Sequence, residues 1–175
     1  SNRSFLFTPG GDLAETYDKI HMFDVRLSSG EIYSESKRYT AGTRTALTDL
    51  PWGKLGMTIC YDMRFPGLYR HLAQAGAAFL TVPSAFTVPT GHAHWHTLLR
   101  ARAIETGCFV FAAAQVGDHE CGRKTFGHSL IISPWGEILA EADGGPGISV
   151  ADIDPEEVHA ARAKIPSLNL EQDYE

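Results

Sequence analysis

The stretch GMTICYDMRFP, residues 56–66, decides the fold. Met57 and Ile59 alternate with small or polar residues up to Cys60, which is the pattern of a half-buried strand. A polar turn follows, and Pro66 stands where a helix can begin. A strand that leads through a tight turn into a helix indicates an α/β arrangement.

Further strands and helices are predicted on both sides of this stretch. Helices are expected over residues 67–75, 94–106 and 155–164. Strands are expected over residues 4–7, 13–18, 55–60, 78–82, 108–115, 129–133, 137–142 and 148–153. Residues 19–42 are polar and irregular, and a loop of that length is usually functional or disordered. The alternating elements predict a layered α/β (α+β) fold.

The composition is that of an ordinary folded chain of one domain, or of part of a larger one. The 175 residues are 43% hydrophobic, enough to bury a sizeable core. A formal net charge of −6 argues against a nucleic-acid-binding surface, and no apolar run approaches the roughly 20 residues of a membrane helix. Cys60, Cys108 and Cys121 form no disulfide framework, so we expect a reducing, cytoplasmic location.

Cys60 is the residue with the clearest potential for chemistry. A residue in a strand-to-helix turn faces outward, and backbone N–H groups of the turn point toward whatever reacts there. This is the arrangement of a nucleophile elbow, here with a thiol in place of a hydroxyl. Asp62 and Arg64 are expected to hold the turn through a charge-assisted hydrogen bond. A buried structural cysteine at a strand end explains the same position.

Four other side chains are weaker candidates. Lys19 lies at a strand end, where it is either a cation beside an oxyanion or a solvated surface charge. His21 and His128 are possible general bases for a cysteine nucleophile, and spacing selects neither of them. Glu35 lies in the irregular loop, where plain solvation also explains it.

Three closely spaced histidines, His92, His94 and His96, are a pattern that could indicate a metal-binding cluster. His92 and His96 would share one helix face. No Glu lies between them as in a zincin motif, and the spacing indicates no third ligand. We therefore expect no metal site at these histidines and no cofactor.

Short segments along the chain carry a resemblance to a known family: YDKIHMF (17–23), GMTICYDMRFP (56–66), PSAF (83–86), HWH with RARAIE (94–105), GHS (127–129) and PWG (134–136). In this order they resemble the carbon–nitrogen hydrolase, or nitrilase, superfamily nearly end to end. They are most similar to its amidase branch, which includes ω-amidase and deaminated-glutathione amidase. The resemblance implies an αββα sandwich, in a single domain over residues 1–175 that lacks its N-terminal part.

The resemblance also implies a catalytic set and a reaction. By it, Cys60 is the nucleophile and Lys19 the cation of the oxyanion site. Glu35 matches a second Glu that positions the substrate, and the backbone N–H of Tyr61 completes the oxyanion hole. The implied reaction cleaves a non-peptide C–N bond of a small, carboxylate-bearing amide through a Cys thioester and releases ammonia. The family's dimeric assembly implies a homodimer or higher homo-oligomer. From the net charge and the lack of a long apolar run, we expect no nucleic-acid or membrane partner.

The sequence departs from the family pattern at two places. The family's general-base Glu lies well before the lysine motif, and here only 18 residues precede Lys19. The chain therefore resembles the C-terminal portion of a longer enzyme, and we expect it to be inactive alone, with exposed sheet edges and apolar faces. The second departure is His96, which stands where the branch often has Glu.

Three other functions stay open at this stage. A nitrilase would act on a nitrile with the same residues. A fragment or partner subunit would keep the fold without activity, because the general-base Glu is not in its expected place. A papain-like Cys–His enzyme is the most distant of the three, since no motif places its histidine.

Overall fold

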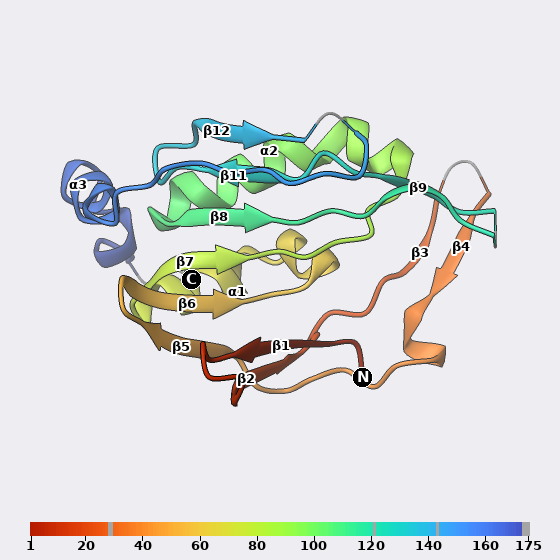
Figure 1. Ribbon diagram of the computed structural model, residues 1–175, viewed down its shortest axis with the longest axis horizontal. Helices are drawn as coiled ribbons and strands as arrows, with labels where there is room; N and C mark the ends of the chain where they lie inside the picture. The colour runs from red at the N-terminus through yellow and green to blue at the C-terminus, as the bar shows by residue number, and fades with distance from the viewer. Residues whose placement is uncertain (28–29, 121, 143, 173–175) are drawn as a thin grey trace.

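A six-stranded mixed sheet forms the centre of the computed structural model, which describes residues 1–27, 30–120, 122–142 and 144–172. The strand order is β12–β11–β8–β7–β6–β5 (Figure 1). The strands are β5 (Ala46–Leu50), β6 (Gly53–Met57), β7 (Ala77–Thr81), β8 (Phe109–Ala112), β11 (Leu130–Ile132) and β12 (Ile138–Glu141). The central strands β6, β7 and β8 run parallel, and the outer strands pair antiparallel.

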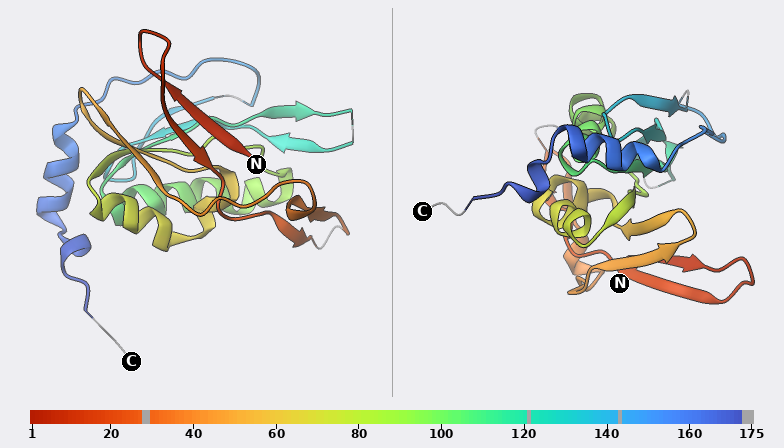
Figure 2. Two further views of the ribbon diagram at one scale, coloured as in Figure 1. Left: turned by 90° about the horizontal axis from the view of Figure 1, so that it is seen from below. Right: turned by 90° about the vertical axis from the view of Figure 1, so that its left-hand side faces the viewer.

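Two helices connect the parallel strands and cover one face of the sheet (Figure 2). After β6, the chain forms the 3-10 helix η2 (Cys60–Arg64) and then α1 (Pro66–Gln74), which leads to β7. The helix α2 (Val88–Thr106) connects β7 to β8. Parallel strands need such crossovers, because a tight turn cannot join them. The main apolar core lies between this face and the helices, with Trp95, Leu99 and Leu80 fully buried.

The opposite face of the sheet is covered by smaller elements. Phe79 and Phe109 pack there with their ring centroids 6.0 Å apart, against Val158 of α3 (Glu156–Lys164). The hairpin of β1 (Arg3–Phe7) and β2 (Leu13–Asp18) lies beside β5, where Tyr17 is buried. The short 3-10 helix η3 (Ser167–Asn169) follows α3.

Two further hairpins lie beyond the carboxyl ends of the parallel strands (Figure 1). They are β3 (Asp24–Arg26) with β4 (Ile32–Ser34), followed by the 3-10 helix η1 (Glu35–Lys37), and β9 (Val116–Asp118) with β10 (Lys124–Phe126). Loops at these strand ends therefore face a space bounded by two hairpins, which is where α/β folds bind their ligands.

The structure confirms the layered α/β fold and the strand–helix order of its centre, and it corrects four details. Residues 19–42, expected to be irregular, contain the β3–β4 hairpin and η1. Strand β5 and the β9–β10 hairpin were not predicted. The strand expected over 148–153 is wrong, since these residues form no strand and Ile148 is 92% exposed.

The fourth correction is that α2 begins at Val88, six residues before the predicted start at His94. Pro89 and Gly91 hide the first turn from a pattern-based prediction, because both residues usually mark loops. Pro89 is tolerated in the first helical turn, where its missing N–H has no intrahelical role. A Cβ atom at Gly91 would lie 2.2 Å from Phe126, so only glycine lets the helix approach that ring.

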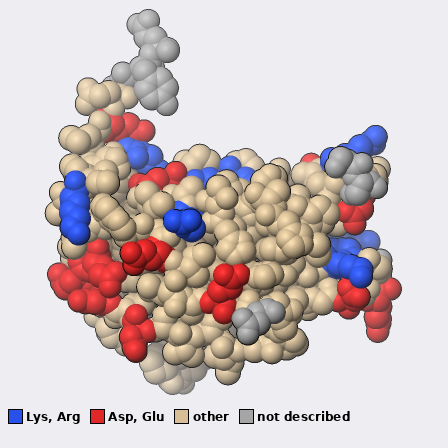
Figure 3. All heavy atoms as spheres, turned by 90° about the horizontal axis from the view of Figure 1, so that it is seen from above, with Lys and Arg blue, Asp and Glu red and all other residues tan. Residues whose placement is uncertain are grey.

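Several large apolar side chains are exposed. Phe7 and Leu13 of the β1–β2 hairpin are 59% and 54% exposed. Figure 3 views the side of the molecule formed by β12 and α2, where acidic and basic side chains leave a wide uncharged area. Among the described residues, no helix is both long and apolar enough to cross a bilayer.

Truncation of Leu99 tests the packing of α2 on the sheet. Leu99 is fully buried, so Leu99→Ala is expected to lower the free energy of unfolding by about 2–5 kcal/mol. Ile104, on the same helix but 53% exposed, provides the matched control, and Ile104→Ala is expected to cost less than about 1 kcal/mol. Urea denaturation followed by circular dichroism measures both changes, and equal losses would contradict this packing.

Candidate active site

A cavity of about 1230 Å³ opens at the carboxyl ends of the parallel strands. Its wall is formed by residues that follow three successive strands, namely 59–61, 83–87 and 113–115, and by the β4–η1 segment. Lys19, Glu35, Cys60 and Tyr61, the residues that the family resemblance singles out, all line it. The fold therefore brings together these four residues, which are up to 42 positions apart in the sequence, from Lys19 to Tyr61.

Cys60 stands at the point where β6 turns into η2. Its φ of 50° lies in the left-handed region, which costs a residue other than glycine of the order of 1–3 kcal/mol. The Cys60 N–H donates to the Pro83 carbonyl oxygen at 3.0 Å, which holds the turn against the end of β7. Cys60 is half-buried and faces the cavity, as expected for a residue in a strand-to-helix turn.

The carboxylate of Asp62 keeps this turn in place. Asp62 is fully buried, and its Oδ2 accepts the Ile59 N–H at 2.9 Å and the Tyr17 hydroxyl at 2.7 Å. Its Oδ1 accepts the His21 backbone N–H at 3.0 Å and lies 2.8 Å from His21 Nδ1. Asp62 thereby connects the turn after Cys60 to β2 and to the residues just after Lys19.

The expected bond between Asp62 and Arg64 is wrong. Arg64 Nη2 lies 3.3 Å from His94 Nδ1, and Asp62 is already satisfied by Tyr17 and His21. His21 is also less suited to act as a base than its position in the sequence indicates. Its ring is stacked on Phe65 with centroids 3.5 Å apart and is held by Asp62, and it is not among the described residues that line the cavity.

Buried Lys19 and half-buried Glu35 form an ion pair in the cavity wall. Lys19 is 2% exposed and donates from Nζ to Glu35 Oε2, so it is not a solvated surface charge. Glu35 Oε2 also accepts the Phe23 N–H at 2.7 Å, and Oε1 accepts Asn2 Nδ2 at 3.1 Å. With three donors, the Glu35 carboxylate is fixed in one orientation. Asn2 belongs to no motif, so sequence reasoning had no signal for it.

The charges in the cavity favour a neutral thiol and an ionised carboxylate. Burial raises the pKa of the Cys60 thiol, and the nearby Lys19 ammonium opposes this only in part. Burial also disfavours the charged form of Glu35, but the hydrogen bonds from Lys19, Phe23 and Asn2 outweigh it and lower the Glu35 pKa. At neutral pH, the site therefore contains a thiol next to a Lys⁺–Glu⁻ pair.

Tyr61 contributes both its backbone and its ring to the wall. Its N–H belongs to the first turn of η2, where helical N–H groups have no partner within the helix. Its ring packs edge-on against Phe23 and Phe65, at centroid distances of 5.0 and 5.4 Å, and Lys19 Nζ lies 6.0 Å from the ring centre. These contacts fix the peptide that follows Cys60.

Arg123 in the cavity wall was not identified from the sequence. Its Nη2 donates to the Ala85 carbonyl oxygen at 3.2 Å, and its guanidinium lies 5.4 Å from the centre of the Tyr33 ring. Its buried Nε has no hydrogen-bond partner among the described residues. Lys37 and Arg38 also line the cavity, so the wall offers cations beyond Lys19. No motif marks them, because they meet only in the folded chain.

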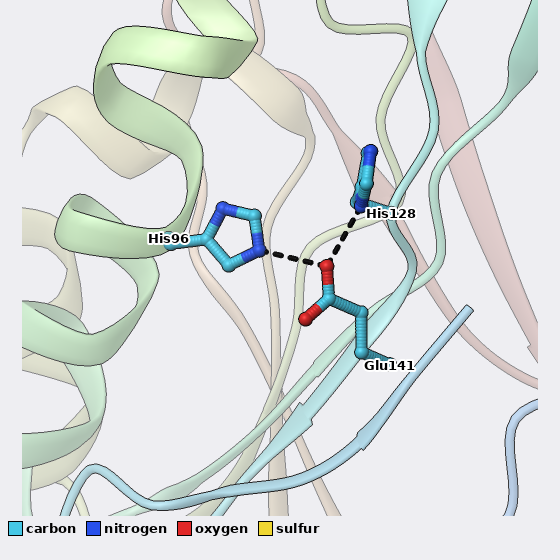
Figure 4. Close-up of side chains that lie close together, drawn as sticks. All are labelled: His96, His128 and Glu141. Carbon is cyan, nitrogen blue, oxygen red and sulfur yellow. Dashed lines mark hydrogen bonds and ion pairs between the residues drawn. The ribbon is translucent and has the colours of Figure 1, made fainter. Parts of the chain in front are cut away.

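The histidines and the other cysteines lie elsewhere. His96 and His128 meet Glu141 outside the cavity, so no described contact places His128 near Cys60 (Figure 4). Cys108 is fully buried in the core. Cys121 lies outside the described residues.

The carbon–nitrogen hydrolase family model matches residues 1–163. The chain belongs to this family. It is 46% identical over 169 residues to a deaminated glutathione amidase of Synechocystis sp., a match that covers 95% of this chain and 62% of the relative. Because relatives match 95% of the chain, the comparisons do not support the expectation that the chain alone is inactive. The family model matches this chain from residue 1 onward. The comparisons therefore do not support the expectation that the chain corresponds only to the C-terminal portion of the family's domain.

Solved structures show the same fold. The NitFhit protein of C. elegans has a TM-score of 0.90 at 40% identity, over 96% of this chain and 41% of that chain. Nit3 of Saccharomyces cerevisiae, a member of branch 10 of the nitrilase superfamily, has a TM-score of 0.85 at 34% identity, over 97% of this chain and 58% of that chain. The chain thus has the nitrilase-superfamily fold and spans less than two thirds of these proteins.

Alkylation with iodoacetamide tests the exposure and the charge state of Cys60. Cys60 lines the cavity and Cys108 is fully buried, so Cys60 is expected to react at least about tenfold faster, as measured by mass spectrometry of labelled peptides. Because burial raises its pKa, the rate should keep rising with pH beyond the range of an ordinary thiol. Modification of Cys108 first would contradict the structure.

Proposed function

We propose that this chain carries the nucleophile and the oxyanion site of a thiol amidohydrolase. The enzyme would cleave a non-peptide C–N bond of a small amide and release ammonia. The observation that carries the proposal is the ion pair of buried Lys19 with Glu35 in the same cavity wall as Cys60. A buried cation is costly unless it is paired, and a cation beside a nucleophile stabilises a developing oxyanion.

In the proposed reaction, the Cys60 sulfur attacks the amide carbonyl carbon. The carbonyl oxygen becomes an oxyanion, which the Lys19 ammonium and the Tyr61 N–H stabilise. A carboxylate takes the thiol proton and gives it to the departing ammonia, so that the C–N bond breaks and a thioester remains. The same carboxylate then takes a proton from water, whose oxygen attacks the thioester carbon. The C–S bond breaks, the carboxylic acid leaves, and the carboxylate returns the proton to the Cys60 sulfur.

Glu35 is proposed to act as a positioning residue and not as this proton carrier. Its two oxygens already accept hydrogen bonds from Lys19, the Phe23 N–H and Asn2. A low pKa also makes it a weak acceptor for the proton of a thiol whose own pKa is raised. By the family resemblance, the proton carrier is a Glu that lies upstream of the lysine motif. Glu15 does not replace it, because Arg44 holds its carboxylate at 3.0 Å.

The proposed substrate is an amide that also bears a carboxylate. Arg123, Lys37 and Arg38 line the cavity, and the buried Arg123 Nε lacks an acceptor among the described residues. Arginine pairs well with planar carboxylates through two parallel hydrogen bonds. The relatives named deaminated glutathione amidase support an amide in preference to a nitrile. Ammonia release from paired amides and nitriles of one acid discriminates the two.

We also propose the assembly and location that the sequence indicates. The protein would form a homodimer or higher homo-oligomer in the cytoplasm and act on a small molecule, without a nucleic-acid or membrane partner. The net charge of −6 supports the absence of a nucleic-acid partner, and the sparse cysteines support a reducing, cytoplasmic location. Light scattering coupled to size-exclusion chromatography measures the assembly.

Loss of the Lys19 ammonium tests the oxyanion site. Lys19→Ala is expected to lower kcat by at least about a hundredfold, as for the loss of one oxyanion donor. Lys54→Ala, at an exposed position on β6, is the matched control and should keep its turnover. Ammonia release is measured on proteins with native circular dichroism. Near-normal turnover in a folded Lys19→Ala protein would remove Lys19 from the mechanism.

Neutralisation of Arg123 tests the substrate class. Arg123→Gln is expected to raise KM about tenfold for an amide that bears a carboxylate, the size of a lost charge-assisted hydrogen bond. The KM for a neutral amide of similar size should change little. Lys124→Gln removes the neighbouring charge, which is paired with Asp118 on the surface, and should leave both constants unchanged. Equal effects of Arg123→Gln on both amides would argue against carboxylate recognition.

A further inference from the structure

Three potential metal ligands converge outside the active-site cavity. His96 lies on α2, His128 between β10 and β11, and Glu141 at the end of β12 (Figure 4). His96 Nε2 is 2.9 Å and His128 Nδ1 is 2.7 Å from the same Glu141 Oε1. The ligand atoms of all three side chains lie within 4.8 Å of one another.

The donor set is that of a transition-metal site. Two imidazole nitrogens and one carboxylate oxygen are ligands that Zn²⁺ prefers, with metal–ligand distances of about 2.0–2.2 Å. Neighbouring ligand atoms around a tetrahedral ion of that size are about 3.3 Å apart. The separations of 2.9 and 2.7 Å from Glu141 Oε1 are shorter than this value, so the carboxylate must rotate slightly away from both imidazoles to admit an ion among the three atoms.

The two imidazoles are held in position by the surrounding fold. The His128 carbonyl oxygen accepts a hydrogen bond from the fully buried Trp95 Nε1 at 2.7 Å, and Trp95 immediately precedes His96 on α2. The Phe126 ring stacks on His128 with centroids 4.4 Å apart and meets His96 edge-on at 6.2 Å. His128 has a φ of 56°, a strained conformation that these contacts sustain. Preorganised ligands lose little freedom when an ion binds.

The cluster is accessible and carries the charge that a cation needs. The side chains of His96, His128 and Glu141 are 34%, 32% and 35% exposed, so an ion and a water molecule can reach them. A carboxylate and two imidazole rings supply the negative charge and the lone pairs that a divalent cation needs.

We propose that His96, His128 and Glu141 bind one Zn²⁺ ion, with water as the fourth ligand. The ion would connect α2 to the end of β12 and to the turn at 127–129, whose Ser129 lines the active-site cavity. Its role is structural, and the proposed hydrolysis needs no metal. This inference departs from the sequence-based expectation of no metal at the histidines, because the third ligand is 45 residues from His96 in the sequence.

Zinc titration of the purified protein, followed by isothermal titration calorimetry, tests the site. A Cys60→Ser background removes the active-site thiol as a competing ligand. We expect about one Zn²⁺ per chain with micromolar or tighter affinity, weakened at least tenfold by His96→Gln and by Glu141→Gln. His92→Gln is the matched control, since His92 lies one helical turn from His96 and is outside the cluster. It should bind zinc unchanged.

Two further measurements keep the proposal falsifiable if a variant folds poorly. Zn²⁺ at a hundredfold excess over its dissociation constant should raise the Tm of the Cys60→Ser protein by roughly 5–10 °C. Co²⁺ in the same protein should show the visible absorption of a tetrahedral nitrogen and oxygen site, without a thiolate charge-transfer band. The proposal is overturned if Zn²⁺ binds only at millimolar concentration, or if His96→Gln and Glu141→Gln bind it as tightly as the background protein.

Discussion

The buried carboxylate of Asp62 is the constraint on which the candidate active site depends. It accepts hydrogen bonds from Ile59, Tyr17 and His21, which belong to separate parts of the chain. A buried charge is tolerated only when it is well paired, so these contacts are strongly coupled to folding. They hold the turn in which Cys60 adopts a left-handed backbone conformation, and they fix the end of β2 from which Lys19 enters the cavity. One carboxylate thereby sets the distance between the two residues.

The sequence predicts the centre of this fold well because its signals there are local. The alternation of apolar with small or polar residues predicts β6, and the run of apolar residues after Gly107 predicts β8. Gly107 itself ends α2, with a φ of 59°. The errors arise where pairing is non-local. The β3–β4 hairpin is too short and polar to be distinguished from a loop. Apolar and polar residues alternate over 148–153 as in a strand. Such a segment forms a strand only if a neighbouring strand pairs with it, and here Ile148 is 92% exposed.

The candidate site was predictable to the extent that it depends on motifs. The resemblance selected Cys60, Lys19 and Glu35, and the structure brings all three to one cavity. What the sequence could not show is which groups share a hydrogen bond. The side chains that bind Asp62 are not that of the nearby Arg64 but those of residues 41 and 45 positions away. Likewise, the third member of the histidine cluster, Glu141, follows from the pairing of β12 with β11 and from no spacing in the sequence.

A raised thiol pKa fits the proposed mechanism better than a preformed thiolate would. An ionised Cys60 beside Lys19 would form a stable ion pair, and the attack on an amide would first have to break it. Lys19 is instead paired with Glu35, whose other donors keep that carboxylate ionised. In the proposed mechanism, the thiol would stay neutral until a base removes its proton, and negative charge would appear only as the oxyanion forms next to the ammonium. Electrostatic stabilisation is then directed at the transition state and not at the resting enzyme, which is the condition for catalysis.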